Sequence, residues 1–383
     1  MGHPGVCQTK AARQNHFVAL AILAILSIVI GCSSHQEQSE AVKTWDAFVQ
    51  AVRRGDLSSA RGLLASESQA HFSFDSTVQQ DYLNSHFTVV KTETIRDYVE
   101  LQVLKEKEGK QTALFKYVVK QGGQSLLQYP FILFAKAWPT VISHHFALHA
   151  LETPASLYAD TLTDTITPDT SVMERYYSTL TDLTGLQAER KIDYYFCQDA
   201  TQAELLSGRL NFSWGSSGMV VISTKRYDFG EITRAFLSSQ KTKTIDALHE
   251  GLVGYGEYQR VLHNSPDSDA LEACDRTIAE HIENLGPHPV TVMIDSAVNH
   301  PVRLQSADFY YGSTGMVRWL IENGRAGSFR HLYSDAANKG AFISELQECY
   351  GKDLRSFESA LQEKYDKYYH KGGGGTGERS KSR

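Results

Sequence analysis

Two neighbouring residues with the capacity for metal and acid–base chemistry, His249 and Glu250, open the stretch HEGLVGY. A zinc-binding HExxH motif carries two histidines four residues apart on one face of a helix, with a glutamate between them that activates water. This stretch lacks the second histidine, because position 253 is valine. Alone, this half of a motif does not predict a metal site.

His249 and Glu250 fall within residues 244–258, where apolar residues recur every three or four positions. That spacing predicts an amphipathic helix. Its core-facing stripe consists of Ile245, Leu248, Leu252 and Tyr255. Glu250 lies roughly opposite the stripe, where a carboxylate is usually solvated. Upstream, residues 227–237 (YDFGEITRAFL) predict a second helix with an apolar inner face.

Other elements must position these two helices. The pattern predicts strands at 141–151, 191–197 and 219–224, a helix at 171–186, and an almost entirely helical chain from residue 227 to about residue 370. His145 and His149 share one face of the first strand. We interpret them as part of a partly exposed strand face rather than as metal ligands.

The stretch LHEGLVGY at 248–255 closely resembles the WLxEGLAEY sequence of gluzincin-type peptidases, the peptidase MA-like group. In that family the glutamate is the third zinc ligand, which the resemblance assigns to Glu250, and the HExxH frame then falls on residues 230–234. Further similar pieces occur in the family's order. They are KIDYYFCQDATQAELLSG at 191–208, GMVVIST at 218–224, YYGSTGMVRWLIENG at 310–324 and FISELQECYGKDL at 342–354.

The resemblance spans residues 141–369 and departs from the family at the metal. Gly230 and Arg234 stand where both histidines belong, while Glu231 keeps the general-base position and Glu250 the third-ligand position. A catalytic zinc needs three protein ligands and an open position for water. We therefore expect a former metal site of Gly230, Arg234 and Glu250, with no metal, no cofactor and no confident catalytic residue.

In that arrangement Arg234 and Glu250 both face the former metal position, so we expect an ion pair between them. The candidate cleft would include His249, Tyr310 and Tyr311. The alternative is a misplaced frame with true ligands elsewhere. However, the downstream histidines do not form a pair at i,i+4 spacing around a glutamate; they are His263, His281 and His288.

Residues 40–138 predict a smaller α+β domain. Two amphipathic helices are separated by Gly55 and Asp56, and strands follow at 98–104, 113–119 and 126–135. The order, including WDAFVQAVRRGDLSSARGLL at 45–64, resembles nuclear-transport-factor-2-like domains. The whole chain is thus predicted as α+β, with a small helix-plus-antiparallel-sheet domain followed by a mostly helical zincin-like domain that begins with a β-sheet.

Residues 1–32 have the pattern of a bacterial lipoprotein signal. Lys10 and Arg13 precede an apolar run at 17–30, and Gly31-Cys32 ends it like a lipobox. We expect a mature chain that begins at lipidated (palmitate-bearing) Cys32, with residues 33–39 as a tether. The protein would then be lipid-anchored and extracytoplasmic in the bacterial cell envelope, at the outer membrane if the cell is Gram-negative. An uncleaved membrane anchor is the alternative.

Charge and cysteine content limit the partners further. A net charge of −6, without a basic stripe before the last dozen residues, argues against nucleic acid. Beyond Cys32, three cysteines remain without CxxC spacing, which favours buried, inert thiols. Residues 371–383 are glycine-rich and basic, and we expect a disordered tail.

Together these features predict a membrane-anchored lipoprotein whose inactive metallopeptidase-like domain binds a peptide or protein partner. Two alternatives remain at this stage. One is an active zinc metallopeptidase with an unusual ligand set that includes Glu250, and the other is a purely structural envelope assembly protein.

Overall fold

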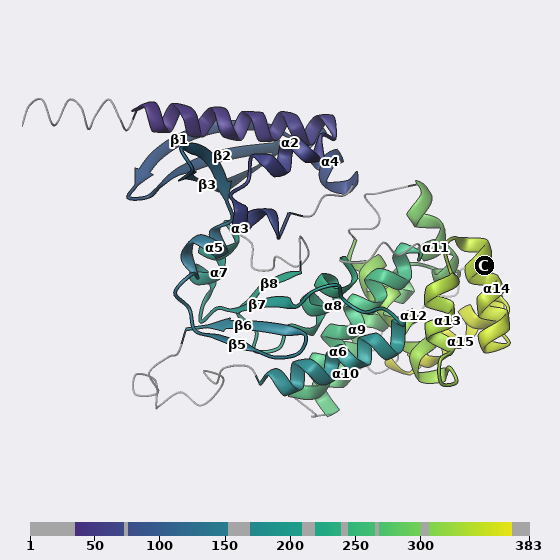
Figure 1. The fold of residues 1–383 in the computed structure, drawn as a ribbon. Coiled ribbons are helices and arrows are strands. Elements are labelled where there is room, and N and C mark those ends of the chain that lie inside the picture. The colour runs from purple at the N-terminus through teal and green to yellow at the C-terminus, as the bar shows by residue number, and fades with distance from the viewer. Residues whose placement is uncertain are drawn as a thin grey trace, which may run out of the picture. The chain divides into compact units, whose positions relative to one another are not determined.

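The computed structural model describes residues 35–72, 76–151, 169–208, 219–238, 244–264, 268–299 and 306–369. Cys32, the signal sequence expected before it and the tail expected at 371–383 lie outside these residues. The chain divides into two compact units, Met1–Lys136 with Gly208–Leu210, and Ala137–Ser207 with Asn211–Arg383. The predicted α+β class is confirmed, since a helix and an antiparallel sheet precede a mixed sheet and a mostly helical region (Figure 1).

The first unit is a four-stranded antiparallel sheet with helices on it. A helix over residues 35–54 comes first. It is followed by α2 (Leu57–Gly62), α3 (Ser66–Gln69), α4 (Ser76–Leu83), β1 (His86–Ile95), β2 (Tyr98–Lys107), β3 (Lys110–Gln121), β4 (Gln124–Gln128) and α5 (Pro130–Phe134). The strands pair in chain order. Trp45 of the first helix is 1% exposed and packs in one cluster with Leu101 and Val103 of β2.

Local sequence explains where these elements begin and end. Gly55 adopts φ +70° after the first helix, a conformation that costs glycine least. Asp56 then accepts a hydrogen bond from the Ser59 backbone N–H at the start of α2. Glu108 and Gly109 both have positive φ in the β2–β3 turn, which suits the twist of a two-residue hairpin.

Two expectations for this unit were wrong. Residues 35–39 are helical rather than a tether, and Gln36 donates a side-chain hydrogen bond to Glu40 one turn later. Such i,i+4 pairs support a helix. The strand expected at 126–135 ends at Gln128, because Pro130 occupies the first turn of α5, a position that proline tolerates well.

The second unit begins with a mixed sheet. Its strands are β5 (Thr140–Ile142), β6 (Phe146–Ala150), β7 (Ile192–Phe196) and β8 (Val220–Ser223), paired in that order. β5 and β6 are antiparallel and the other pairs are parallel. The single strand expected at 141–151 is therefore a hairpin, closed by a hydrogen bond from the Ser143 N–H to the Phe146 carbonyl. The helices α6 (Thr170–Thr184) and α7 (Ala200–Ser207) connect the parallel strands.

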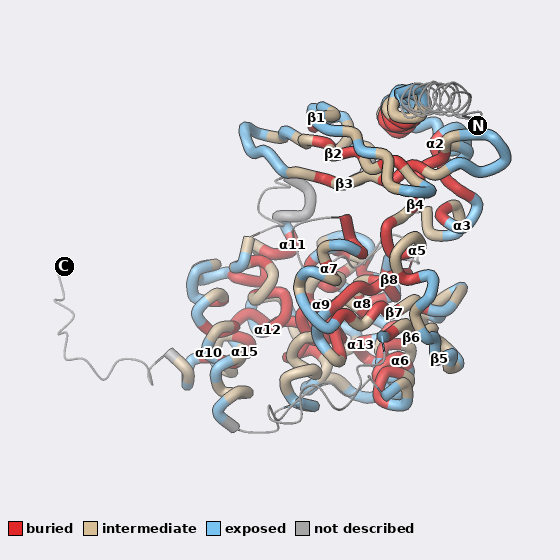
Figure 2. Tube along the Cα trace, turned by 90° about the vertical axis from the view of Figure 1, so that its left-hand side faces the viewer, coloured by how far each residue is buried: buried red, intermediate tan, exposed pale blue. Residues whose placement is uncertain are grey.

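The rest of the second unit is helical in its described part. The helices are α8 (Phe229–Ser238), α9 (Asp246–Asn264), α10 (Ser268–Asn284), α11 (Pro289–Asn299), α12 (Ala307–Asn323), α13 (Ser328–Asp335), α14 (Lys339–Tyr350) and α15 (Leu354–Tyr369). Buried residues concentrate in α8, α9 and α12 (Figure 2). Within the described ranges, no helix has both the length and the apolar character needed to cross a membrane.

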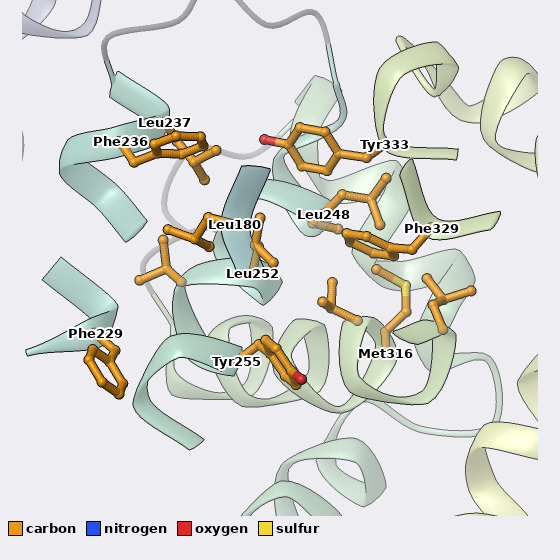
Figure 3. Packing of buried hydrophobic residues seen from close by; sticks show 14 of the residues in the cluster. Leu180, Phe229, Phe236, Leu237, Leu248, Leu252, Tyr255, Met316, Phe329 and Tyr333 are labelled. Atoms are coloured by element: carbon orange, nitrogen blue, oxygen red, sulfur yellow. The ribbon is translucent and has the colours of Figure 1, made fainter. Parts of the chain in front are cut away.

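The predicted apolar stripes of α8 and α9 form the centre of this core. Phe236 of α8 and Leu252 of α9 are fully buried and belong to the same core cluster as Met316 of α12 and Phe329 of α13 (Figure 3). Burying a side chain of this size stabilises the fold by about 1.5–3 kcal/mol. The polar residues of α8 and α9 consequently lie on the faces that point away from this core.

Glycines set how closely α9 approaches α12. A Cβ atom at Gly251 would collide with the Ser313 carbonyl oxygen, and one at Gly254 with Thr314 Oγ1. Because both contacts are made by α12, the two helix backbones lie unusually near each other. This close approach brings the first turn of α12, with Tyr310, toward the polar side of α9.

Candidate functional site

Arg234 of α8 and Glu250 of α9 form an ion pair across the two helices. Arg234 Nη1 lies 3.1 Å from Glu250 Oε1 and 3.4 Å from Oε2. Arg234 Nε lies 3.7 Å from Glu231 Oε1 on the same helix. The side chains of Arg234 and Glu250 are 30% and 26% exposed. The predicted ion pair is confirmed, and one guanidinium serves two carboxylates.

This ion pair stabilises the charge on Arg234. Burial alone would lower the pKa of the guanidinium, but the charges of Glu250 and Glu231 raise it above its usual value. Arginine is effectively always protonated in proteins. A permanent positive charge therefore occupies the position where the resemblance would place a metal ligand.

Gly230 faces a different carboxylate from Arg234. A Cβ atom built on Gly230 would lie 2.7 Å from Glu257 Oε1 and 2.9 Å from Glu257 Cγ. Glu257 lies about two helical turns beyond Glu250 on α9. The two ends of the HExxH frame, positions 230 and 234, therefore face two separate glutamates. A histidine at position 230 would have to displace the Glu257 side chain.

The residues at this place do not fit a zinc ion. Arg234 contributes a cation rather than a ligand, Gly230 contributes no side chain, and Glu250 is already engaged by Arg234. Across the described ranges, no group of three or more His, Cys, Asp or Glu side chains is arranged to hold a metal. Zinc chemistry at neutral pH depends on such a ligand set.

Of the three residues expected in a cleft, two line a pocket. Tyr310 and Tyr311, at the start of α12, border a pocket of about 310 Å³ between α9, α10 and α12. His249 and Glu231 do not line it. His249 is half-buried, and its burial lowers its pKa although the nearby Glu250 acts in the opposite direction. His249 is therefore mainly neutral at pH 7.

Tyr310 connects the ion pair and the pocket. Burial is the main cause of its raised pKa, and the charges of Glu257, Arg234 and Glu250 all act on its hydroxyl. A tyrosine whose pKa is raised keeps its proton at neutral pH, so its hydroxyl can donate a hydrogen bond. Tyr310 therefore offers a donor between the Arg234–Glu250 pair and the pocket.

A carboxyl pair of the buried Asp228 and the half-buried Glu257 also lies here, and sequence reasoning missed it. Asp228 is 1% exposed and accepts hydrogen bonds from Ser223 Oγ, at 2.7 Å, and from the Glu231 backbone N–H. Burial, and then the charge of Glu257, raises the pKa of Asp228 to about 7. Asp228 therefore remains largely protonated up to about neutral pH and donates a hydrogen bond to Glu257.

Two cations complete the group around Glu257. Lys225 Nζ lies 3.2 Å from Glu257 Oε2 and 3.6 Å from Asp228 Oδ2. Arg260 Nε, one turn further along α9, donates to Glu257 Oε2 at 3.0 Å. We call Lys225, Asp228, Glu257 and Arg260 the carboxyl cluster. Asp228 directly precedes α8, which begins at Phe229, within the stretch 227–237 that was expected to be helical throughout. Aspartate commonly caps helices, so its presence there was a usable signal.

The remaining histidines form separate pairs with carboxylates or aromatic rings. His145 Nδ1 lies 2.6 Å from Glu174 Oε2, and His149 Nε2 lies 3.1 Å from Asp193 Oδ1. The downstream histidines are also apart: His281 pairs with Asp308, His288 pairs with Glu358, and the His263 ring contacts Tyr227. His145 lies in the turn between β5 and β6 and only His149 lies in a strand, so the expectation that the two share one strand face is wrong.

Comparison with known proteins adds a structural likeness. No protein-family model matches the sequence, and no curated protein matches it. The structure is similar to the crystal structure of a two-domain M1 zinc metallopeptidase with bound L-tryptophan, at 11% sequence identity and a TM-score of 0.36. The likeness covers 73% of this chain and 61% of that chain. A TM-score of 0.36 is too low to carry any equivalence between residues of the two proteins.

Proposed function

We propose that this protein is a lipid-anchored, extracytoplasmic lipoprotein whose second unit is a metallopeptidase-like domain that binds a peptide or protein partner without cleaving it. The observation that supports the absence of cleavage is the Arg234–Glu250 ion pair. Arg234 Nη1 donates to Glu250 at 3.1 Å and Arg234 Nε faces Glu231. The fixed guanidinium of Arg234 contributes positive charge and no metal ligand, so the site lacks the ligand set that zinc requires.

Binding is favoured over a purely structural role by the neighbouring pocket. Tyr310 and Tyr311 present aromatic surface, and Tyr310 keeps a hydroxyl donor close to the ion pair. Mostly apolar concave sites with a few directed polar groups are the usual places where proteins hold ligands. The anchoring half of the proposal is supported by the sequence alone, through the apolar run at 17–30 and Cys32.

The test measures metal, cleavage and binding on one preparation of the mature chain. We expect less than about one zinc per ten chains by elemental analysis, because one carboxylate of three ligands does not hold zinc. A quenched-fluorescence peptide library should show no cleavage with or without added zinc. Members of the same library should bind in a pull-down read by mass spectrometry, and binding should weaken in Tyr310→Ala.

Each alternative gives a different result. Stoichiometric zinc that is lost in Glu250→Ala, together with cleavage, would establish a peptidase with an unusual ligand set. Absence of both zinc and peptide binding would favour a structural assembly role. The exposed variant Arg276→Ala is the matched control, because its side chain is 56% exposed and lies outside the pocket.

A further inference from the structure

The pocket between α9, α10 and α12 carries an arginine on a wall that is otherwise mainly aromatic and apolar. Tyr258, Tyr310 and Tyr311 provide rings, and Val261 and Ile278 provide aliphatic surface. Arg260 joins this wall from α9, one turn after Glu257. Glu257 also lines the pocket, so Arg260 and Glu257 are its two charged residues. A few directed polar groups in a mainly apolar lining are what orient a ligand in such sites.

Arg260 is held in place by only one of its donors. Its Nε donates to Glu257 Oε2 at 3.0 Å, and its side chain is 26% exposed. Within the described part of the chain, no hydrogen bond engages its terminal Nη1 and Nη2 groups. The fork of N–H donors that guanidinium offers to a carboxylate is therefore preoriented and available.

A thiol on the neighbouring helix α10 shares the pocket with Arg260. Cys274 of α10 also lines the pocket. Burial raises the pKa of the Cys274 thiol, whereas the charge of Arg260 acts to lower it. The guanidinium of α9 and the thiol of α10 thus influence each other across the same space.

The charge of Arg260 is in excess of what the carboxyl cluster can neutralise. Glu257 already receives Lys225 at 3.2 Å, together with the hydrogen bond from the protonated Asp228. Two cations therefore share one ionised carboxylate near neutral pH. While Asp228 keeps its proton, below about pH 7, the carboxyl cluster therefore carries a net positive charge, which favours an anionic ligand.

We propose that this pocket binds a monocarboxylate with a compact apolar body, carried by a small free acid or by the C-terminal residue of a peptide. The carboxylate accepts from Arg260 Nη1 and Nη2, and the body packs against the rings of Tyr258 and Tyr311. A volume of about 310 Å³ suits one such group. The pocket is the one to which the proposed function assigns binding, so the inference rests on that proposal and names the chemistry of its ligand.

Cys274 supplies a built-in reporter, and Cys349 an internal control. Cys274 lines the pocket, whereas Cys349 is similarly half-buried on α14 away from it. The rate of iodoacetamide alkylation at each thiol is measured by mass spectrometry on the whole mature chain. The probes are 3-phenylpropanoate and its amide, and an N-acetylated alanyl-alanyl-phenylalanine with a free or an amidated C-terminus.

We expect at least one acid to slow alkylation of Cys274 while leaving Cys349 unchanged. Its amide should need a concentration about tenfold higher or more, because a charge-assisted hydrogen bond contributes about 1.5–3 kcal/mol. Protection by the free acid and the peptide acid indicates recognition of the carboxylate itself. Protection by the peptide acid alone assigns the site to peptide C-termini, and protection by the free acid alone assigns it to small acids.

Two variants test whether Arg260 binds the carboxylate of the ligand. Arg260→Gln should abolish the preference for acid over amide, and Arg260→Lys should keep part of it, because lysine retains charge without the fork. Arg276→Gln on α10 is the matched control and should behave as the unchanged protein. Thermal melting verifies that each variant is folded. The inference is overturned if neither acid protects Cys274, if amides protect as well as acids, or if folded Arg260→Gln keeps the preference.

Discussion

Arg234 Nη1 of α8 lies 3.1 Å from Glu250 Oε1 of α9, and the same guanidinium faces Glu231 at 3.7 Å. The two carboxylates would repel each other if left together without a cation. Arginine at this position therefore has a defined electrostatic role in joining the two helices. That role can be measured without knowledge of any ligand.

Arg234→Met should lower the free energy of unfolding by about 1–2 kcal/mol, between the values for exposed and buried ion pairs, because both partners are roughly one-third exposed. Urea unfolding measures the change. In a double-mutant cycle, Glu250→Gln should cost much less once Arg234 is absent. Strictly additive effects of the two substitutions would show that the pair contributes no coupling energy.

Gly230→Ala should destabilise the protein by about 1–3 kcal/mol, the usual cost of overpacking. The added Cβ atom would lie 2.7 Å from Glu257 Oε1, and Lys225 and Arg260 hold that carboxylate in place. Gly62→Ala is the control, because a Cβ atom there meets nothing within 4 Å. Equal unfolding midpoints for the two variants would contradict the close contact.

The Gly230→His, Arg234→His double variant tests the proposed frame. Because position 230 faces Glu257 and position 234 faces Glu250, we expect zinc binding only with a loss of stability, as Glu257 is displaced. Elemental analysis and isothermal titration with zinc measure the result. A folded double variant that binds no zinc would count against any relation between residues 230–234 and a metal site.

The stability of the protein should depend on the proton of Asp228. Its pKa rises to about 7 in the folded state, from about 3.9 in an unfolded chain. Between about pH 4 and 7 the folded state keeps a proton that the unfolded state loses. This group's contribution to stability is thus complete at the acidic end and falls as pH rises, by at most about 1.4 kcal/mol per pH unit.

The Asp228→Asn variant isolates the contribution of Asp228 protonation to stability. Its amide N–H can donate a hydrogen bond to Glu257 at every pH. Urea unfolding from pH 5 to 8 should show that the unchanged protein loses stability with rising pH and that the variant loses less. Staying above pH 5 avoids the protonation of Glu257, whose pKa is lowered. Parallel profiles for the two proteins would mean that Asp228 is ionised throughout.

Cys32→Ala should shift the protein from the membrane fraction to the soluble fraction, or leave an unprocessed precursor. The physical reason is that stable anchoring of this type depends on two or more acyl chains carried by that residue. Fractionation and mass spectrometry of the N-terminus measure the outcome. Normal cleavage with unchanged membrane retention would exclude lipidation at Cys32.

The sequence by itself determined which faces of α8 and α9 are buried. Apolar residues at three- and four-residue steps assign Phe236 and Leu252 to the core, and both are fully buried. Periodicity is a local property of each helix, so it identifies the buried face without knowledge of the fold. The Arg234–Glu250 contact was also predictable, because the resemblance placed both residues at one point between two helices.

The periodicity of one helix does not predict which residues of other elements contact its polar face. Asp228 and Glu257 are far apart in the chain and match no motif, yet they share a proton because α8 and α9 bring them together. The 310 Å³ pocket exists only where α9, α10 and α12 meet. The hairpin that divides residues 141–151 likewise depends on a hydrogen bond from Ser143 to Phe146.

One physical cause separates the features that the sequence predicts from those that only the structure shows. Burial follows from the hydrophobic character of each residue in its own helix, which the sequence records directly. The ionisation of Asp228 and the availability of Arg260 depend on distances between side chains on separate elements. Those distances are set by backbone packing, such as the close approach at Gly251 and Gly254, and only the tertiary structure decides them.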